Sequence, residues 1–153
     1  TGDSLGPLVG SGLCKKNLHR SRIFGTLDQP VHAVNLHEQL SDASDRFNDP
    51  FIVAIDACLG QLSSVGCIQV ADGPVKPGAA VQKQLPPVGD MHITGIVNVS
   101  GFMEYFVLQN TRLSQVMRMA EQISDSIIQA LVQCNRVRTL PSAPLTSPDQ
   151  QFL

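Results

Sequence analysis

The stretch Phe-Ile-Val-Ala-Ile-Asp-Ala-Cys-Leu-Gly, residues 51–60, decides how the rest of the chain is interpreted. Five apolar residues follow Pro50 and lead directly into Asp56, and the run ends at Gly60. A continuous apolar run of this length indicates a strand covered on both faces, as in a parallel sheet. We expect Asp56 at the carboxyl end of this strand, where ligands bind in open α/β sheets. Asp56 is therefore the first candidate for chemistry; the alternative is that it only caps or braces the next turn.

The chain opens with a predicted helix. Asp3 or Ser4 can accept hydrogen bonds from the first turn, and Pro7 is tolerated that early in a helix. Gly6 and Gly10 lie four residues apart, so they share one face and would let the helix lie close against a sheet. A helix that begins in this way ordinarily follows a strand. We therefore expect that the sheet's first strand is either absent from the sequence given or dispensable.

Further elements alternate along the chain. We predict a short strand over residues 22–27 and a helix over 36–47, with Asn35 and Glu38 as a capping pair. With the strand at 51–60 they form a strand–helix–strand unit, which favours parallel pairing. Residues 66–72 alternate as an edge strand of a hairpin should, residues 91–99 form another apolar strand, and the longest helix opens at Asn110 and Thr111. These patterns predict one α/β domain over residues 1–138 and a flexible C-terminal tail over residues 139–153.

Composition and charge narrow the classes of function. The 153 residues carry a net charge of −2, with 5% aromatic residues and no Trp, so binding to nucleic acid is not indicated. No apolar run approaches the ~18 residues that indicate a membrane span, and no signal segment opens the chain. The four cysteines form no Cys-x-x-Cys pair, which gives no support for a zinc knuckle or a redox motif. We expect a soluble cytoplasmic protein without a nucleic-acid or membrane partner.

Two acids, Asp3 and Asp56, are each placed where a loop meets the predicted crevice end of the sheet. If their carboxyl groups approach, like-charge repulsion would raise one pKa, and one group could act as base toward water while the other acts as acid toward an amide. This pattern predicts acid–base hydrolysis of a peptide bond. His92 is the only His inside an apolar strand, and with the two acids it would instead form a metal site. The alternative for His92 is a ring that is hydrogen-bonded within the strand.

Other chemistries have weaker motifs. The segment 98–102 lacks the Gly before Ser100 that a nucleophile elbow needs, and no Cys has an evident His partner. The glycines at 6, 10 and 12 match neither the phosphate-binding loop nor the dinucleotide fingerprint. We therefore expect no cofactor, with a divalent metal at Asp3, Asp56 and His92 left open.

Five segments carry a resemblance to a known family. They are Thr-Gly-Asp-Ser-Leu-Gly-Pro-Leu-Val-Gly at 1–10, Gly-Thr-Leu-Asp-Gln-Pro-Val-His-Ala-Val-Asn-Leu at 25–36, Ala-Ile-Asp-Ala-Cys-Leu-Gly at 54–60, Lys-Pro-Gly-Ala-Ala-Val at 76–81 and Thr-Gly-Ile-Val-Asn-Val-Ser-Gly-Phe-Met-Glu-Tyr at 94–105. Together they resemble the YyaC-type sporulation proteins, which are short relatives of the spore germination protease, and the resemblance extends to about residue 135. It implies the fold of the hydrogenase-maturation peptidases: a three-layer α/β/α sandwich with a mostly parallel, twisted sheet.

The resemblance also implies site residues. Asp3 and Asp56 match the two acids proposed to be catalytic in the germination protease, one in an Asp-x-Leu-Gly-Pro segment and one in an Ile-Asp-Ala segment. In the maturation peptidases the corresponding acidic positions bind nickel together with a His, for which His92 is the candidate here. Family members normally carry a strand and a Gly-Thr-Asp-type loop before the position of Thr1, and the chain lacks further segments of the full germination protease.

The function expected from these residues and this resemblance is that of a sporulation-associated peptidase. Its substrates would be proteins or peptides, with small acid-soluble spore proteins as the first candidates, and it would act in the cytoplasm of sporulating cells or in the developing spore. The alternative is a non-catalytic sporulation protein that uses the peptidase fold as a binding module. Assembly into a homo-oligomer is left open.

Overall fold

Helices and strands alternate in the computed structural model, which describes residues 1–16, 18, 21–77 and 85–139. The C-terminal tail predicted for 139–153 lies, from residue 140 on, outside the described residues. In chain order, with η for a single 3-10 turn, the elements are η1 (Gly2–Ser4), α1 (Leu5–Cys14), α2 (Leu36–Arg46), β1 (Val53–Gly60), η2 (Leu62–Ser64), β2 (Ile68–Asp72), β3 (Met91–Val99), α3 (Glu104–Gln109) and α4 (Leu113–Thr139).

The three strands pair into one mixed sheet in the order β1–β3–β2. β1 and β3 run parallel, with Asp56 opposite Thr94. β2 runs antiparallel to β3, and a bridge between Val75 and Val88 extends this hairpin. The predicted α/β class and the edge hairpin are therefore confirmed. The parallel pairing that was predicted for residues 51–60 had residues 22–27 as its partner, whereas the partner found is β3.

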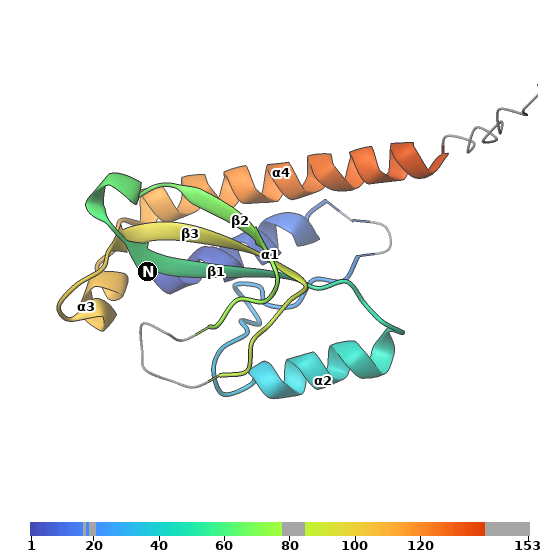
Figure 1. The fold of residues 1–153 in the computed structure, drawn as a ribbon, viewed down its shortest axis with the longest axis horizontal. Coiled ribbons are helices and arrows are strands. Elements are labelled where there is room, and N and C mark those ends of the chain that lie inside the picture. The colour runs from blue at the N-terminus through green and yellow to red at the C-terminus, as the bar shows by residue number, and fades with distance from the viewer. Residues whose placement is uncertain (17, 19–20, 78–84, 140–153) are drawn as a thin grey trace, which may run out of the picture.

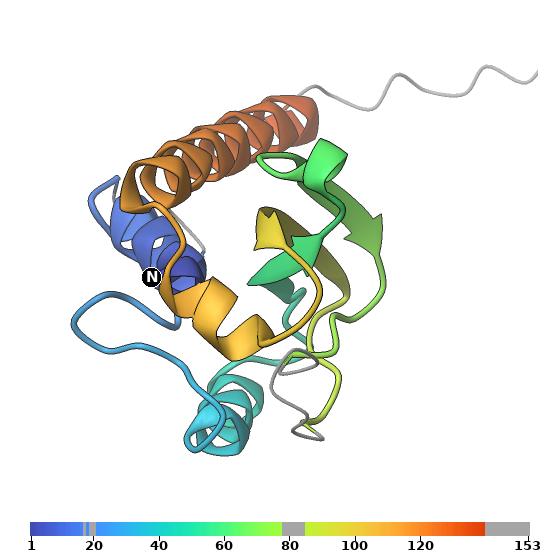
Figure 2. The same ribbon diagram turned by 90° about the vertical axis from the view of Figure 1, so that its left-hand side faces the viewer.

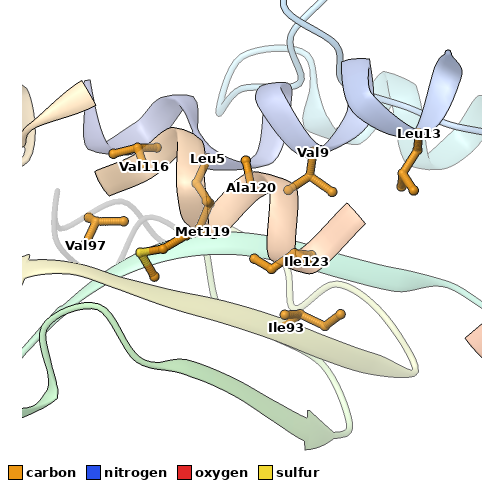
Figure 3. Close-up of a cluster of buried hydrophobic side chains, with 9 residues drawn as sticks. All are labelled: Leu5, Val9, Leu13, Ile93, Val97, Val116, Met119, Ala120 and Ile123. Carbon is orange, nitrogen blue, oxygen red and sulfur yellow. The ribbon is translucent and has the colours of Figure 1, made fainter. Parts of the chain in front are cut away.

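One face of the sheet is covered by α1 and α4, which also pack against each other (Figures 1 and 2). Gly95 of β3 lies under these helices, where a Cβ would overlap the side chain of Leu5. In both views α2 lies on the other side of the sheet from α4. Figure 3 shows the buried apolar cluster between the two helices and β3, which consists of Leu5, Val9, Leu13, Ile93, Val97, Val116, Met119, Ala120 and Ile123.

Two glycines set how α1 is seated. A Cβ at Gly6 would lie 3.2 Å from the carbonyl oxygen of Ile55, so the first turn of the helix lies directly against β1, as predicted. A Cβ at Gly10 would overlap the carbonyl oxygen of Gly25, so this turn lies against a loop and not against the sheet. The shared face of the two glycines therefore contacts two different parts of the chain.

Two local predictions are wrong. Residues 22–27 form no strand, because Gly25 has a φ of 82°, a left-handed conformation that interrupts extended pairing; the predicted strand–helix–strand unit is absent from this part of the chain. α2 does begin at Leu36, but Asn35 makes no side-chain cap on it. The Asn35 side chain instead accepts a hydrogen bond from His32 N (2.8 Å) and donates one to Pro30 O (3.0 Å), so it organises the loop before the helix.

Candidate functional site

Asp56 lies in the middle of β1 and not at its carboxyl end, because the strand continues to Gly60. The expected position at the strand end is therefore wrong. Its neighbours Ile55 and Ala57 pack against the apolar core. Since successive side chains of a strand point to opposite faces, the Asp56 carboxyl group lies on the face of the sheet turned away from α1 and α4.

The Asp56 carboxyl group is half-buried and has few polar partners. Its Oδ1 accepts a hydrogen bond from Ala57 N at 2.9 Å. Burial raises the pKa of Asp56 from 3.8 to about 6, and the bond from Ala57 offsets part of this rise. The expected cause was repulsion by a second carboxylate, whereas the cause found is the loss of hydration. A fraction of Asp56 therefore carries a proton near neutral pH.

Thr94 and Cys58 share this face of the sheet with Asp56. Thr94 lies opposite Asp56 across the parallel pair and is 8% exposed. Burial raises the pKa of the Cys58 thiol, a hydrogen bond with the Thr94 side chain lowers it, and the charge of Asp56 raises it further. These two residues were not among the site residues predicted from the sequence. The two-residue spacing of Asp56 and Cys58 within a strand was the available signal for their shared face.

Asp3 lies in η1, the turn immediately before α1. This turn packs against β1 and against α3. Gly2 is buried there, and a Cβ at Gly2 would lie 2.7 Å from Cδ1 of Leu108. The Asp3 side chain is 75% exposed. The two predicted acids therefore come from adjoining elements, one carboxyl group exposed to water and the other half-buried.

His92 lies near the beginning of β3, beside the hairpin with β2. Its Nδ1 is 2.9 Å from the carbonyl oxygen of Gly73, so the ring is hydrogen-bonded within the hairpin. Among the described residues, no three His, Cys, Asp or Glu side chains form a group that could hold a metal ion. Asp3, Asp56 and His92 are thus not gathered into a three-ligand site.

Helix α3 and the N-terminal turn meet at one end of the sheet (Figures 1 and 2). Asn98, near the end of β3, donates through Nδ2 to Val107 O and to Thr111 Oγ1, both at 3.3 Å. Thr1 Oγ1 donates to Gln109 O at 3.0 Å. α3 itself was not predicted from the sequence. These hydrogen bonds hold α3 between the end of β3 and the turn that carries Asp3.

The fold and the site define a mixed α/β domain with a half-buried acid on its sheet. The chain belongs to the family described as "Protein of unknown function (DUF1256)", which matches residues 1–126. It is 59% identical over 127 residues to "Uncharacterized protein YyaC" of Bacillus subtilis (strain 168), an alignment that covers 83% of this chain and 62% of that protein. The chain thus spans less than two thirds of the length of this relative. The resemblance to YyaC-type proteins is confirmed.

Two further findings concern solved structures and membrane-spanning helices. No solved structure matches the chain. None of the helices in the described ranges is long and apolar enough to cross a membrane.

Proposed function

We propose that this protein is a peptidase that hydrolyses protein substrates through Asp3 and Asp56. The observation that carries the proposal is the half-buried carboxyl group of Asp56, whose pKa is raised to about 6, on a strand against which the Asp3 turn packs. Carboxyl groups perturbed in this way cluster at functional sites, because acid–base catalysis near neutral pH needs them.

The two acids take different roles because their surroundings differ. The exposed Asp3 carboxylate removes a proton from water as the water oxygen attacks the carbonyl carbon of the peptide bond. The protonated Asp56 gives its proton to the amide nitrogen as the carbon–nitrogen bond breaks, which releases an acid and an amine. Exchange with solvent then returns one proton to Asp56 and removes one from Asp3. The mechanism needs no metal ion, and its rate falls as the pH rises past about 6 because Asp56 loses its proton.

The motif resemblance to the YyaC-type proteins and the germination protease supports the biological part of the proposal. The protein would act in the cytoplasm of sporulating cells or in the developing spore, with small acid-soluble spore proteins as the first substrates to test. We also propose the three-layer α/β/α sandwich with a mostly parallel sheet for the complete fold. The positions of α4 and α2 on opposite sides of the sheet support the three layers, and the pairing of β1 with β3 supports the parallel part of the sheet.

The test is cleavage of small acid-soluble spore proteins, with the products mapped by mass spectrometry. Asp3→Asn and Asp56→Asn each remove one acid and keep the side-chain shape. Asp28→Asn changes an exposed acid in the loop between α1 and α2 and is the matched control. We expect the wild type and Asp28→Asn to cut the same bonds. The other two variants should be slower by about 100-fold or more. Equal cleavage by all four folded proteins would contradict the assigned roles.

The alternative function is a non-catalytic binding module, which one observation favours: several large apolar side chains around α3 are exposed. If the folded wild type binds spore proteins and leaves every peptide bond intact, the binding function replaces the peptidase. The same mass-spectrometric assay therefore decides between the two.

A further inference from the structure

Thr94 has two possible hydrogen-bond partners on the neighbouring strand β1. It lies directly opposite Asp56, and Cys58 follows two residues further along the same face of the sheet. Thr94 is 8% exposed, and a hydroxyl on a side chain buried to this extent needs a partner within the protein. In the part of the chain that the structure describes, no buried side-chain nitrogen or oxygen lacks a partner. The partner that Thr94 takes therefore decides whether Asp56 receives a second hydrogen bond.

The Thr94 hydroxyl bonds to the Cys58 thiol. Within the described ranges, the hydrogen bond to the Asp56 carboxyl group comes from Ala57 N alone. Burial raises the pKa of the Cys58 thiol, so the thiol is uncharged near neutral pH and acts as a hydrogen-bond partner. Thr94 and Asp56 thus lie side by side without a bond between them.

The elements around Asp56 carry few charges. None of η1, α1, β1, β2 and β3 contains a Lys or Arg. Their acids and histidines, other than Asp56, are Asp3, Asp72 and His92. Asp3 is exposed, Asp72 lies on the opposite face of the sheet, and the His92 ring is hydrogen-bonded within the hairpin. The hydrogen bond that Thr94 could donate is therefore the main interaction open to the Asp56 carboxyl group.

We propose that Cys58 is a positioning residue for Asp56: its thiol engages the Thr94 hydroxyl and keeps this hydroxyl away from the Asp56 carboxyl group. A hydroxyl has one hydrogen to donate, so Thr94 cannot donate to both residues at once. A hydrogen bond to a carboxylate is stronger than one to the neutral acid, and it would favour the ionised form. By holding Thr94, Cys58 preserves the proton on Asp56. The inference rests on the proposed peptidase only for the use of that proton in catalysis.

The pKa of Asp56 is the measurement, and it needs no substrate. NMR of the side-chain carboxyl carbons follows it between about pH 3 and 9, and the signal absent from Asp56→Asn assigns it. Cys58→Ala removes the thiol and leaves the Thr94 hydroxyl to turn to Asp56, so the pKa of Asp56 should fall by about 1. Cys58→Ser keeps a partner for Thr94 and should leave the pKa of Asp56 near the wild-type value of about 6.

Thr94→Val separates the effect of the hydroxyl from that of the thiol. Val keeps the shape of the side chain, and the hydroxyl makes no bond to Asp56 in the wild type, so this variant should retain the raised pKa of Asp56. Adding Thr94→Val to Cys58→Ala should restore the wild-type value, because the freed hydroxyl is then absent. Cys134→Ala, at an exposed thiol on α4, is the matched control and should change nothing.

Three results would overturn the proposal. The first is a pKa of Asp56 that Cys58→Ala leaves unchanged. The second is a fall in Cys58→Ala that the added Thr94→Val does not reverse. The third is a rise of about 1 in Thr94→Val alone, because the hydroxyl would then already donate to Asp56 in the wild type.

The pH profile of spore-protein cleavage tests the peptidase separately. With a pKa lower by about 1, Cys58→Ala should cleave about tenfold more slowly than the wild type near neutral pH, because less Asp56 is protonated. If Asp56 titrates as expected in a protein that cuts no peptide bond, the peptidase is refuted and Cys58 keeps its positioning role. Cleavage with a pH profile that Cys58→Ala does not shift would refute the role of Cys58 and leave the peptidase. The two failures are thus distinguishable.

Discussion

Replacing Asp56 with Asn tests the buried carboxyl group without any assay of activity. Burial raises its pKa from 3.8 to about 6, a difference of about 2. Each unit corresponds to about 1.36 kcal/mol, so the ionised carboxylate costs the folded protein about 3 kcal/mol. Asn keeps the shape and an oxygen that can accept the bond from Ala57, and it cannot ionise.

The sign of the pH dependence follows from the raised pKa. Below pH 3.8 the acid is protonated in both the folded and the unfolded chain, and it contributes nothing. As the pH rises from 3.8 to about 6, the unfolded chain ionises first, so the free energy of unfolding falls. Above about pH 6 the free energy of unfolding has fallen by the full amount of about 3 kcal/mol, and this loss then stays constant. The stability of Asp56→Asn relative to the wild type should therefore increase with pH over this window.

Urea unfolding followed by circular dichroism measures this difference at about pH 4, 6 and 8. In thermal unfolding, a difference of about 3 kcal/mol in the free energy of unfolding raises the midpoint temperature. At the upper pH the midpoint of the variant should therefore be higher than that of the wild type by about 6–12 °C. Asp28→Asn removes an exposed acid and should show no comparable change. A stability difference that is constant across this range would refute the burial argument, as would a wild type that gains on the variant with rising pH.

Three further perturbations test the support of the site. Gly10→Ala forces a Cβ onto a backbone carbonyl and should destabilise the protein by about 2–3 kcal/mol, whereas Gly6→Ala in the same helix, with 3.2 Å of room, should cost less; urea unfolding that reverses this order would contradict the seating of α1. Asn98→Ala removes the hydrogen bond to Val107 O of α3 and should lower the free energy of unfolding by about 1–3 kcal/mol; an unchanged unfolding midpoint would show that this bond does not stabilise the protein. Added nickel or zinc should not raise the unfolding temperature, since the described residues gather no three-ligand group around His92; a rise that His92→Ala abolishes would restore the metal site.

Regular apolar patterns allowed the sheet to be predicted. β3 occupies residues 91–99 as predicted, because a long apolar run has few alternatives to a buried strand. The edge strand β2 was also predictable from alternation. The beginning of α2 at Leu36 was predicted correctly, although the side-chain cap at Asn35 on which that prediction relied does not form. In these segments the local pattern and the tertiary environment favour the same structure.

The sequence was less informative where a tertiary contact decides the structure. The extended segment before Asp28 pairs with no strand, since Gly25 turns it against Gly10 of α1. The short helix α3 has an exposed aromatic face, which gives no amphipathic signal, and its ends are held by Asn98 and Thr1 from other parts of the chain. Asp56 is distinctive in the sequence as an acid in an apolar run, but the cause of its raised pKa depends on burial that only the folded sheet provides.

The contact between Gly2 and Leu108 has a consequence for how the molecule opens. Because Gly2 is buried under the side chain of Leu108, η1 cannot move outward unless α3 moves with it. The turn that carries Asp3 and helix α3 should therefore form one cooperative opening unit, with amide hydrogens that exchange at a common rate. A ligand that holds α3 in place would then slow exchange in both segments, and so keep Asp3 beside β1 for as long as the ligand stays bound.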